Sequence, residues 1–99
     1  MSGEKLCRLR GAAIETSRDV YDQLARQLGF PDWFDPNLDA LWDVLTTEIP
    51  GPIRVVWDDA ECSQERLGKD FKRLRRVLRE VAKQRADFTL EMGKQQRRK

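Results

Sequence analysis

Hydrophobic and polar residues alternate in the first segment of the chain and then recur at helical spacing. Residues 6–10, Leu-Cys-Arg-Leu-Arg, alternate approximately every second position, as a short strand does, and Gly11 ends the run. Thr16 or Ser17 can cap a following helix, in which Asp19 interacts favourably with the helix dipole. The apolar face of this helix and its stop signal consist of Val20, Tyr21, Leu24, Ala25, Leu28, Gly29 and Pro31.

A second helix is predicted after the loop 30–36. Asn37 is a favourable N-cap, and the apolar stripe that follows has helical spacing. The segment 50–52, Pro-Gly-Pro, then breaks the chain. Residues 53–57, Ile-Arg-Val-Val-Trp, are β-branched and mostly apolar, which predicts a central strand buried on both faces. The stripe of the second helix consists of Leu38, Leu41, Trp42 and Leu45.

The last third of the chain predicts one long helix and one strand. Residues 58–63 are expected to form a turn or a short helix, and an amphipathic helix is expected from about 66 to 84. Its outward face is almost entirely Lys and Arg. Residues 87–92 predict a final strand, and 94–99 a basic, mobile tail. The apolar face of the long helix consists of Phe71, Leu74, Val77, Leu78 and Val81.

Strands separated by helices imply right-handed crossovers and a parallel sheet. We therefore predict an α/β fold with a three-stranded parallel sheet packed with about four helices. A chain of 99 residues supports one hydrophobic core, so residues 1–93 are expected to form a single domain.

Composition narrows the function classes. The chain has no His, which removes the commonest proton-transfer group and a common metal ligand, and we expect neither an enzyme nor a metal or cofactor site. Cys7 and Cys62 are 55 positions apart and are expected to be reduced, half-buried thiols. We find no segment typical of a signal peptide or of a membrane span, so a cytoplasmic location is expected.

A formal charge of +2 conceals a strong segregation along the chain. Residues 1–30 hold five basic and four acidic side chains, residues 31–62 hold one and eight, and residues 63–99 hold thirteen and five. The three net charges are therefore +1, −7 and +8. The middle segment predicts a negative field that steers cationic partners, unless the basic last third folds over it.

Two acids of the second helix draw attention. Asp39 and Asp43 are four residues apart, so they share a helix face and repel each other, and no Lys or Arg stands at i±3 or i±4 of either. Asp39 is near the helix N-terminus, where the dipole favours a carboxylate, but Asp43 has no such local reason. Solvated surface acids remain the simpler interpretation. In the preceding loop, Trp33 and Phe34 either pack as a lid on the core or present an aromatic contact beside the acids.

Residues 28–43, which read LGFPDWFDPNLDALWD, resemble the signature of the barstar family, whose members inhibit barnase-type and related guanyl-specific ribonucleases. The run 37–43 is the specific part, and the likeness covers most of residues 5–92. It implies a three-stranded parallel sheet with helices packed around it. It also implies a monomer that forms a 1:1 complex with a ribonuclease.

The resemblance assigns roles as well. Asp43 would enter the nuclease's phosphate-binding site and accept hydrogen bonds from its arginines and catalytic histidine, so that the inhibitor mimics a substrate phosphate. Asp39 would meet an arginine at the guanine-side rim. Trp33 stands where the family usually has a tyrosine that stacks on that histidine, and Glu80 falls on a rim acid. The other candidates for ribonuclease binding are Asp35, Asn37, Trp42 and Glu48.

The chain departs from the family pattern in several places. Asp35-Pro36 replaces the usual glycine-containing turn, and Glu48 replaces a frequent aromatic, so rim contacts are expected to differ. Glu80 could be neutralised within its own helix. The cations around Glu80 are Arg76, Arg79 and Lys83.

Two rival functions remain. An enzyme would use Asp39 and Asp43 as an acid–base pair, but both lie on one helix that offers no evident cleft. The basic last third, which is unlike the acidic balance of the family, is interpreted as a solvated helix face or as a weak, nonspecific attraction to nucleic acid. The alternative function is a barstar-fold interaction module or RNA-associated module that uses this basic last helix and tail. The cations in question are Arg73, Arg76, Lys83, Arg85, Arg97, Arg98 and Lys99.

Overall fold

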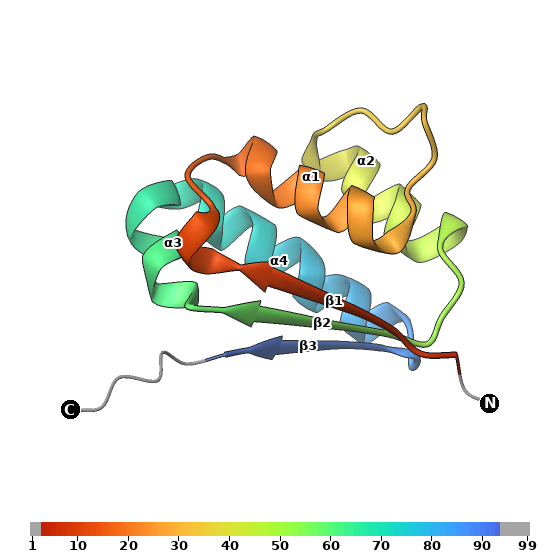
Figure 1. Ribbon diagram of the computed structural model, residues 1–99. Coiled ribbons are helices and arrows are strands. Elements are labelled where there is room, and N and C mark those ends of the chain that lie inside the picture. Colours follow the sequence, from red (N-terminus) through yellow and green to blue (C-terminus); the bar gives the residue numbers. More distant parts are fainter. Residues whose placement is uncertain (1–2, 94–99) are drawn as a thin grey trace.

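The computed structural model describes residues 3–93 and contains one three-stranded parallel sheet (Figure 1). Its strands are β1 (Lys5–Arg10), β2 (Ile53–Asp58) and β3 (Phe88–Met92), in the spatial order β1-β2-β3. The predicted α/β class, the parallel pairing and the central position of β2 are confirmed. The tail predicted at 94–99 lies outside the described residues.

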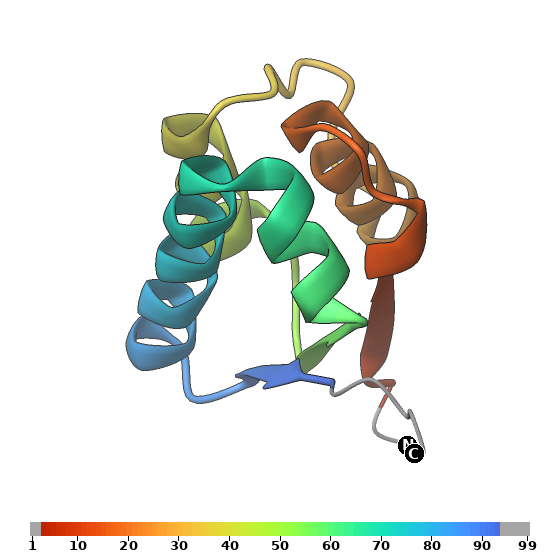
Figure 2. The ribbon, with the colours of Figure 1, turned by 90° about the vertical axis from the view of Figure 1, so that its left-hand side faces the viewer.

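The four α-helices within residues 3–93 cover the same face of the sheet (Figure 2). They are α1 (Ser17–Leu28), α2 (Leu38–Asp43), α3 (Ala60–Leu67) and α4 (Lys69–Gln84). The buried apolar side chains form one cluster between these helices and the sheet. No helix within residues 3–93 is long and apolar enough to cross a membrane.

The prediction that the central strand is buried on both faces is wrong. Ile53, Val55 and Trp57 point into the core and are at most 1% exposed, whereas Arg54 and Asp58 lie on the other face of the sheet, which no helix covers. These two charged residues form ion pairs with Glu91 and Arg8, respectively, on the neighbouring strands. A β-branched run is therefore compatible with a strand that is fully buried on one face only.

The caps predicted for α1 are present. Thr16 is the N-cap, and the Asp19 carboxylate accepts hydrogen bonds from the backbone N–H groups of Glu15 and Thr16, which lower the pKa of Asp19. Gly29 ends the helix with a φ of 73°, a conformation that glycine adopts without steric cost.

The long helix predicted from about 66 to 84 is two helices. Gly68 separates α3 from α4, with a φ of 56° and a ψ of −120° that a helix cannot accommodate. The short helix expected within 58–63 begins at Ala60 and extends to Leu67. The periodicity of apolar residues did not reveal this break, because both helices present apolar residues to the same core.

The two cysteines are free, as expected, but only Cys62 is half-buried. Cys7 is fully buried on the inner face of β1, and this burial raises its pKa to about 12. A thiol of this kind stays protonated at neutral pH and packs as a small apolar side chain.

Candidate functional site

The candidate site is the solvent-facing side of α2 together with the loop that precedes it. Asn37 begins the helix, because its Oδ1 accepts a 2.8 Å hydrogen bond from the backbone N–H of Ala40. The Asn37 amide also donates to Asp35 Oδ2 at 3.2 Å. These two bonds order the entry to the helix, so the candidate Asn37 has a structural role as its N-cap.

The helix ends in one π-helical turn, η2 (Val44–Glu48), which the sequence analysis did not predict. The N–H of Ile49 donates to the carbonyl oxygen of Val44, five residues earlier, at 3.2 Å. The hydroxyls of Thr46 and Thr47 donate to the carbonyls four residues before them at 2.7 and 2.6 Å, an arrangement that bends helices. Two adjacent threonines near the helix end were the signal that could have indicated this turn.

Arg85, which follows α4, binds the end of this helical segment. Its Nη1 donates to the carbonyl oxygens of Leu45 and Ile49, both at 2.7 Å, and the side chain is only 15% exposed. The same guanidinium forms two 2.8 Å hydrogen bonds with Asp87, which lower the pKa of that carboxyl group. Arg85 therefore satisfies carbonyl groups that a helix end leaves unpaired, and it holds the segment in place.

The buried residues of α2 and η2 determine which side faces solvent. Leu41, Val44 and Leu45 are fully buried, which leaves Asp39 and Asp43 exposed on the opposite side. Within residues 3–93, neither carboxylate lies within 4.0 Å of a Lys or Arg nitrogen or accepts a side-chain hydrogen bond. The exposed acids of this region, here called the acidic face, are Asp32, Asp35, Asp39, Asp43 and Glu48.

The two loop aromatics have different roles. Trp33 is 61% exposed, so it presents a large apolar surface to solvent beside the acidic face. Phe34 is half-buried and its ring lies 4.9 Å from Phe30 and 6.0 Å from Tyr21, centroid to centroid. The structure therefore brings Trp33 to the candidate site and uses Phe34 as a lid on the core.

A groove of about 360 Å³ lies between α2 and α4, and two further candidate residues, Trp42 and Glu80, both line it. Trp42 is half-buried in it, and Glu80 lies at its edge with Lys83 Nζ at 3.9 Å, while no ion pair to Arg76 is formed. Arg76 nevertheless lines the same groove as Asp39. The basic helix α4 thus borders the acidic face, but the exposed carboxylates show that it does not cover this face.

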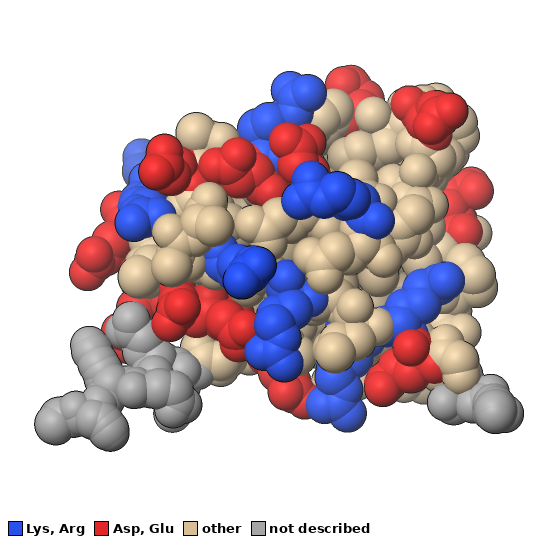
Figure 3. Space-filling model, in the orientation of Figure 1, with Lys and Arg blue, Asp and Glu red and all other residues tan. Residues whose placement is uncertain are grey.

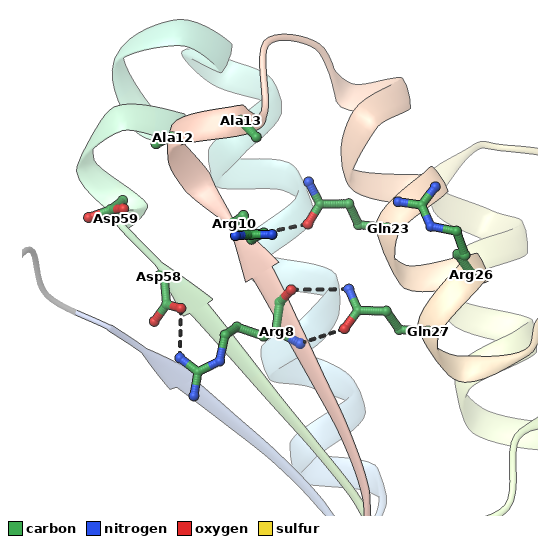
Figure 4. A pocket seen from close by; sticks show the side chains of 9 residues that line it. All are labelled: Arg8, Arg10, Ala12, Ala13, Gln23, Arg26, Gln27, Asp58 and Asp59. Atoms are coloured by element: carbon green, nitrogen blue, oxygen red, sulfur yellow. Dashed lines mark hydrogen bonds and ion pairs between the residues drawn. The ribbon is translucent and has the colours of Figure 1, made fainter.

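A second hollow, of about 970 Å³, lies at the free edge of β1 (Figure 4). Its lining mixes cations and acids, and Arg8 is paired with Asp58 at 2.7 Å. Two glutamines of α1 reach the backbone of β1, as Gln27 exchanges two 3.0 Å hydrogen bonds with Arg8 and Gln23 accepts one of 2.9 Å from the N–H of Arg10. No α2 residue lines this hollow, so it is separate from the candidate site.

The surface around that hollow shows interspersed charges of both signs (Figure 3). No group of three or more potential metal ligands occurs among residues 3–93. The acidic face differs from this mixed surface, because none of its carboxylates forms an ion pair with a Lys or Arg of residues 3–93.

The chain is similar to known proteins along most of its length. Residues 4–94 match the profile of a protein family described as "Barstar (barnase inhibitor)". A Bacillus subtilis (strain 168) protein named "Putative ribonuclease inhibitor YrdF" is 34% identical over 77 residues, which cover 78% of this chain and 85% of that protein. The family match spans nearly all of the described residues, including every strand and helix. The chain belongs to the barstar family.

Proposed function

We propose that this protein inhibits a guanyl-specific microbial ribonuclease of the barnase type or a related one by placing Asp43 in the phosphate-binding part of its active site. The coarser function follows from the family, whose proteins are ribonuclease inhibitors and not enzymes. The type of nuclease, the 1:1 stoichiometry and the roles of individual residues are the parts that we add.

The observation that carries the proposal is the unpaired state of Asp43. An exposed aspartate in the second turn of a helix, with Asp39 one turn before it, is unfavourable to the helix by a few tenths of a kcal/mol. No cation in residues 3–93 lies close enough to compensate. A ribonuclease that binds a phosphodiester holds cationic donors in its active site, and these donors would supply the missing partners.

The neighbouring residues support the same kind of partner. Asp39 would pair with a cation at the rim of the nuclease cleft, and the exposed ring of Trp33 would add apolar contact area beside the charges. Asp35, Trp42, Glu48 and Glu80 would add contacts at the rim of the same cleft. Asn37 would contribute mainly by capping the helix that carries both aspartates.

The test is a titration of the protein into a guanyl-specific ribonuclease, with cleavage of a guanosine-containing dinucleotide as the readout. We expect inhibition that reaches completion at one inhibitor per enzyme. A histidine-dependent ribonuclease without guanine specificity serves as the control and should remain active. If no guanyl-specific enzyme is inhibited at stoichiometric concentration, the proposed target class is wrong.

A further inference from the structure

The outer surface of α4 carries a row of cations for which neither the fold nor the proposed inhibition provides a partner. Five of them stand at alternating spacings of three and four residues, which places them along one side of the helix. All five side chains are exposed. This set, here called the basic stripe, consists of Lys69, Lys72, Arg76, Arg79 and Lys83.

Few acidic side chains neutralise the positive charges of the basic stripe. Lys83 has a 3.9 Å contact with Glu80, while the second acid of α4, Asp70, pairs at 3.4 Å with Arg73, which lies beside the stripe. Lys69, Lys72, Arg76 and Arg79 form no ion pair within residues 3–93. Neighbouring like charges at these spacings destabilise a helix by a few tenths of a kcal/mol each, so the stripe is unfavourable to α4 itself.

Arginines elsewhere in the protein are used differently. Arg8 and Arg54 form ion pairs across the sheet, Arg66 donates to the carbonyl oxygen of Ala12 at 2.7 Å, and Arg85 binds Asp87 and two carbonyls. Within residues 3–93, most of the arginines outside α4 therefore have an ion pair or hydrogen bond inside the protein. The basic stripe is left available to a ligand from outside.

The shape and chemistry of α4 limit what that ligand can be. A helix of 16 residues is about 24 Å long, so its cations match a polyanion with regularly repeated charges. Shallow grooves between these side chains are lined only by α4 residues, all of them cations except Glu80. The apolar face of α4 is buried in the core, so the helix has no apolar surface to insert into a membrane.

The absence of exposed aromatic rings on α4 further limits which polyanion the basic stripe can bind. The exposed large hydrophobic residues within 3–93 are Leu6 and Trp33, and neither belongs to α4. Proteins that hold single-stranded nucleic acids stack the bases on aromatic side chains. A duplex keeps its bases stacked inside and presents its phosphates on the outside, where Lys and Arg can bind them without aromatic rings. Contacts to phosphates alone position a protein on a duplex without sequence preference.

From these observations we propose that the basic stripe of α4 binds the phosphate backbone of a nucleic-acid duplex without sequence specificity. This site borders the acidic face at the groove that Arg76 shares with Asp39, but its binding does not depend on the proposed ribonuclease inhibition. A surface that contacts about five phosphates loses affinity steeply with salt, with a slope of log K against log[salt] of about −4.5.

The experiment measures fluorescence anisotropy of a labelled 20-base-pair DNA duplex, and of an RNA duplex of the same sequence, from about 50 to 200 mM salt. The test variant is K69Q/K72Q/R79Q, whose three cations are unpaired and do not line the groove beside Asp39. We expect its affinity at the lowest salt to fall at least about tenfold. The salt dependence should become weaker, with a slope of about −2 in place of about −4.5. Its thermal stability should equal or exceed that of the parent, because like-charge repulsion is removed.

The matched control is R10Q/R18Q/R26Q, which removes the same charge from β1 and α1 and should change affinity less than about threefold. A second variant, K94Q/R97Q/R98Q/K99Q, tests the end of the sequence. Equal weakening by the control would indicate attraction by net charge alone and overturn the proposal. No salt-dependent binding by the parent, or a loss of binding confined to the 94–99 variant, would overturn it as well. Loss of ribonuclease inhibition in the test variant, with no duplex binding by the parent, would assign the stripe to a protein partner instead.

Discussion

On the exposed side of α2, Asp39 and Asp43 have no partner among the described residues, whereas at the end of the same helical segment Arg85 has four hydrogen bonds to Leu45, Ile49 and Asp87. Both regions are charged, but their charges have different consequences. Those around Arg85 stabilise the fold, whereas Asp43, one turn after Asp39, is slightly unfavourable to its helix. The contacts within the fold explain the Arg85 cluster, and the proposed ribonuclease partner would explain Asp43.

The most severe test of this difference is Asp43→Ala. We expect the affinity for the ribonuclease to fall by about a hundredfold or more, because the cationic groups of the nuclease would lose a desolvated charge partner. The unfolding free energy should stay unchanged or rise by a few tenths of a kcal/mol. Inhibition constants and urea denaturation curves measure the two quantities.

Asp22→Ala on α1 is the control for Asp43→Ala, since it removes an exposed helical aspartate that lies outside the acidic face and pairs with Arg18 at 3.5 Å. It should leave inhibition within about twofold of the parent. If Asp43→Ala stays within tenfold while the fold is intact, Asp43 is not the central contact.

The opposite result is expected at Arg85. Replacing it with Met removes charge-assisted hydrogen bonds to two carbonyl groups and leaves Asp87 without its cation, so the unfolding free energy should fall by about 2 kcal/mol. Inhibition per folded molecule should change much less. The measurement is urea denaturation at constant pH, with the midpoint and slope compared between variants.

Arg10→Met is the control for Arg85→Met, because the Arg10 guanidinium forms no hydrogen bond or ion pair within residues 3–93. Its unfolding free energy should stay within about 0.5 kcal/mol of the parent. Equal losses in the two variants would mean that the Arg85 cluster has no special structural role.

Smaller effects should rank the remaining contacts of the acidic face. Asp39→Ala and Trp33→Ala should each weaken inhibition by about tenfold, equal to about 1.4 kcal/mol. Glu80→Ala should have the least effect, because Lys83 already lies 3.9 Å from its carboxylate. Parallel inhibition titrations measure the order, and a Glu80 effect larger than that of Asp39 would place the centre of the interface on the α4 side of the groove.

The smallest effect concerns pH. Hydrogen bonds from Arg85 lower the pKa of Asp87 below its ordinary value of 3.8, so the folded protein binds the proton less tightly than the unfolded chain does. The stabilisation by this carboxylate is therefore fully present well above pH 3.8. It is lost as the pH falls below 3.8 and passes the lower pKa that Asp87 has in the folded protein. Urea denaturation at pH 7 and pH 3 should show a larger loss for the parent than for Asp87→Asn, and equal losses would contradict the structural role of the pair.

Sequence periodicity predicted the architecture well, because the apolar positions of the three strands and of α1 repeat with the spacing of their elements. It missed the break at Gly68, because α3 and α4 both pack on the same core. It also wrongly predicted that β2 is buried on both faces, because the outward residues of β2 include charged side chains that pair across the sheet. The capping role of Asn37 followed from local chemistry.

The candidate site was predictable only in part. The residues three and four positions from Asp43 already indicated that it has no cation partner on its own helix. In the structure, no Lys or Arg elsewhere in residues 3–93 forms an ion pair with it either. The support from Arg85, 40 residues after Leu45, and the presence of Arg76 in the groove beside Asp39 depend on tertiary packing. No pattern of nearby residues along the chain indicates such contacts.

The two glutamines of α1 beside β1 have a consequence for self-association. An edge strand normally offers unpaired backbone groups to which a strand of another molecule can add. Here Gln27 occupies both the N–H and the carbonyl oxygen of Arg8, and Gln23 occupies the N–H of Arg10. A foreign strand would have to displace these side chains before it could pair with β1. The helix that covers the core thus also protects this edge of the sheet against aggregation.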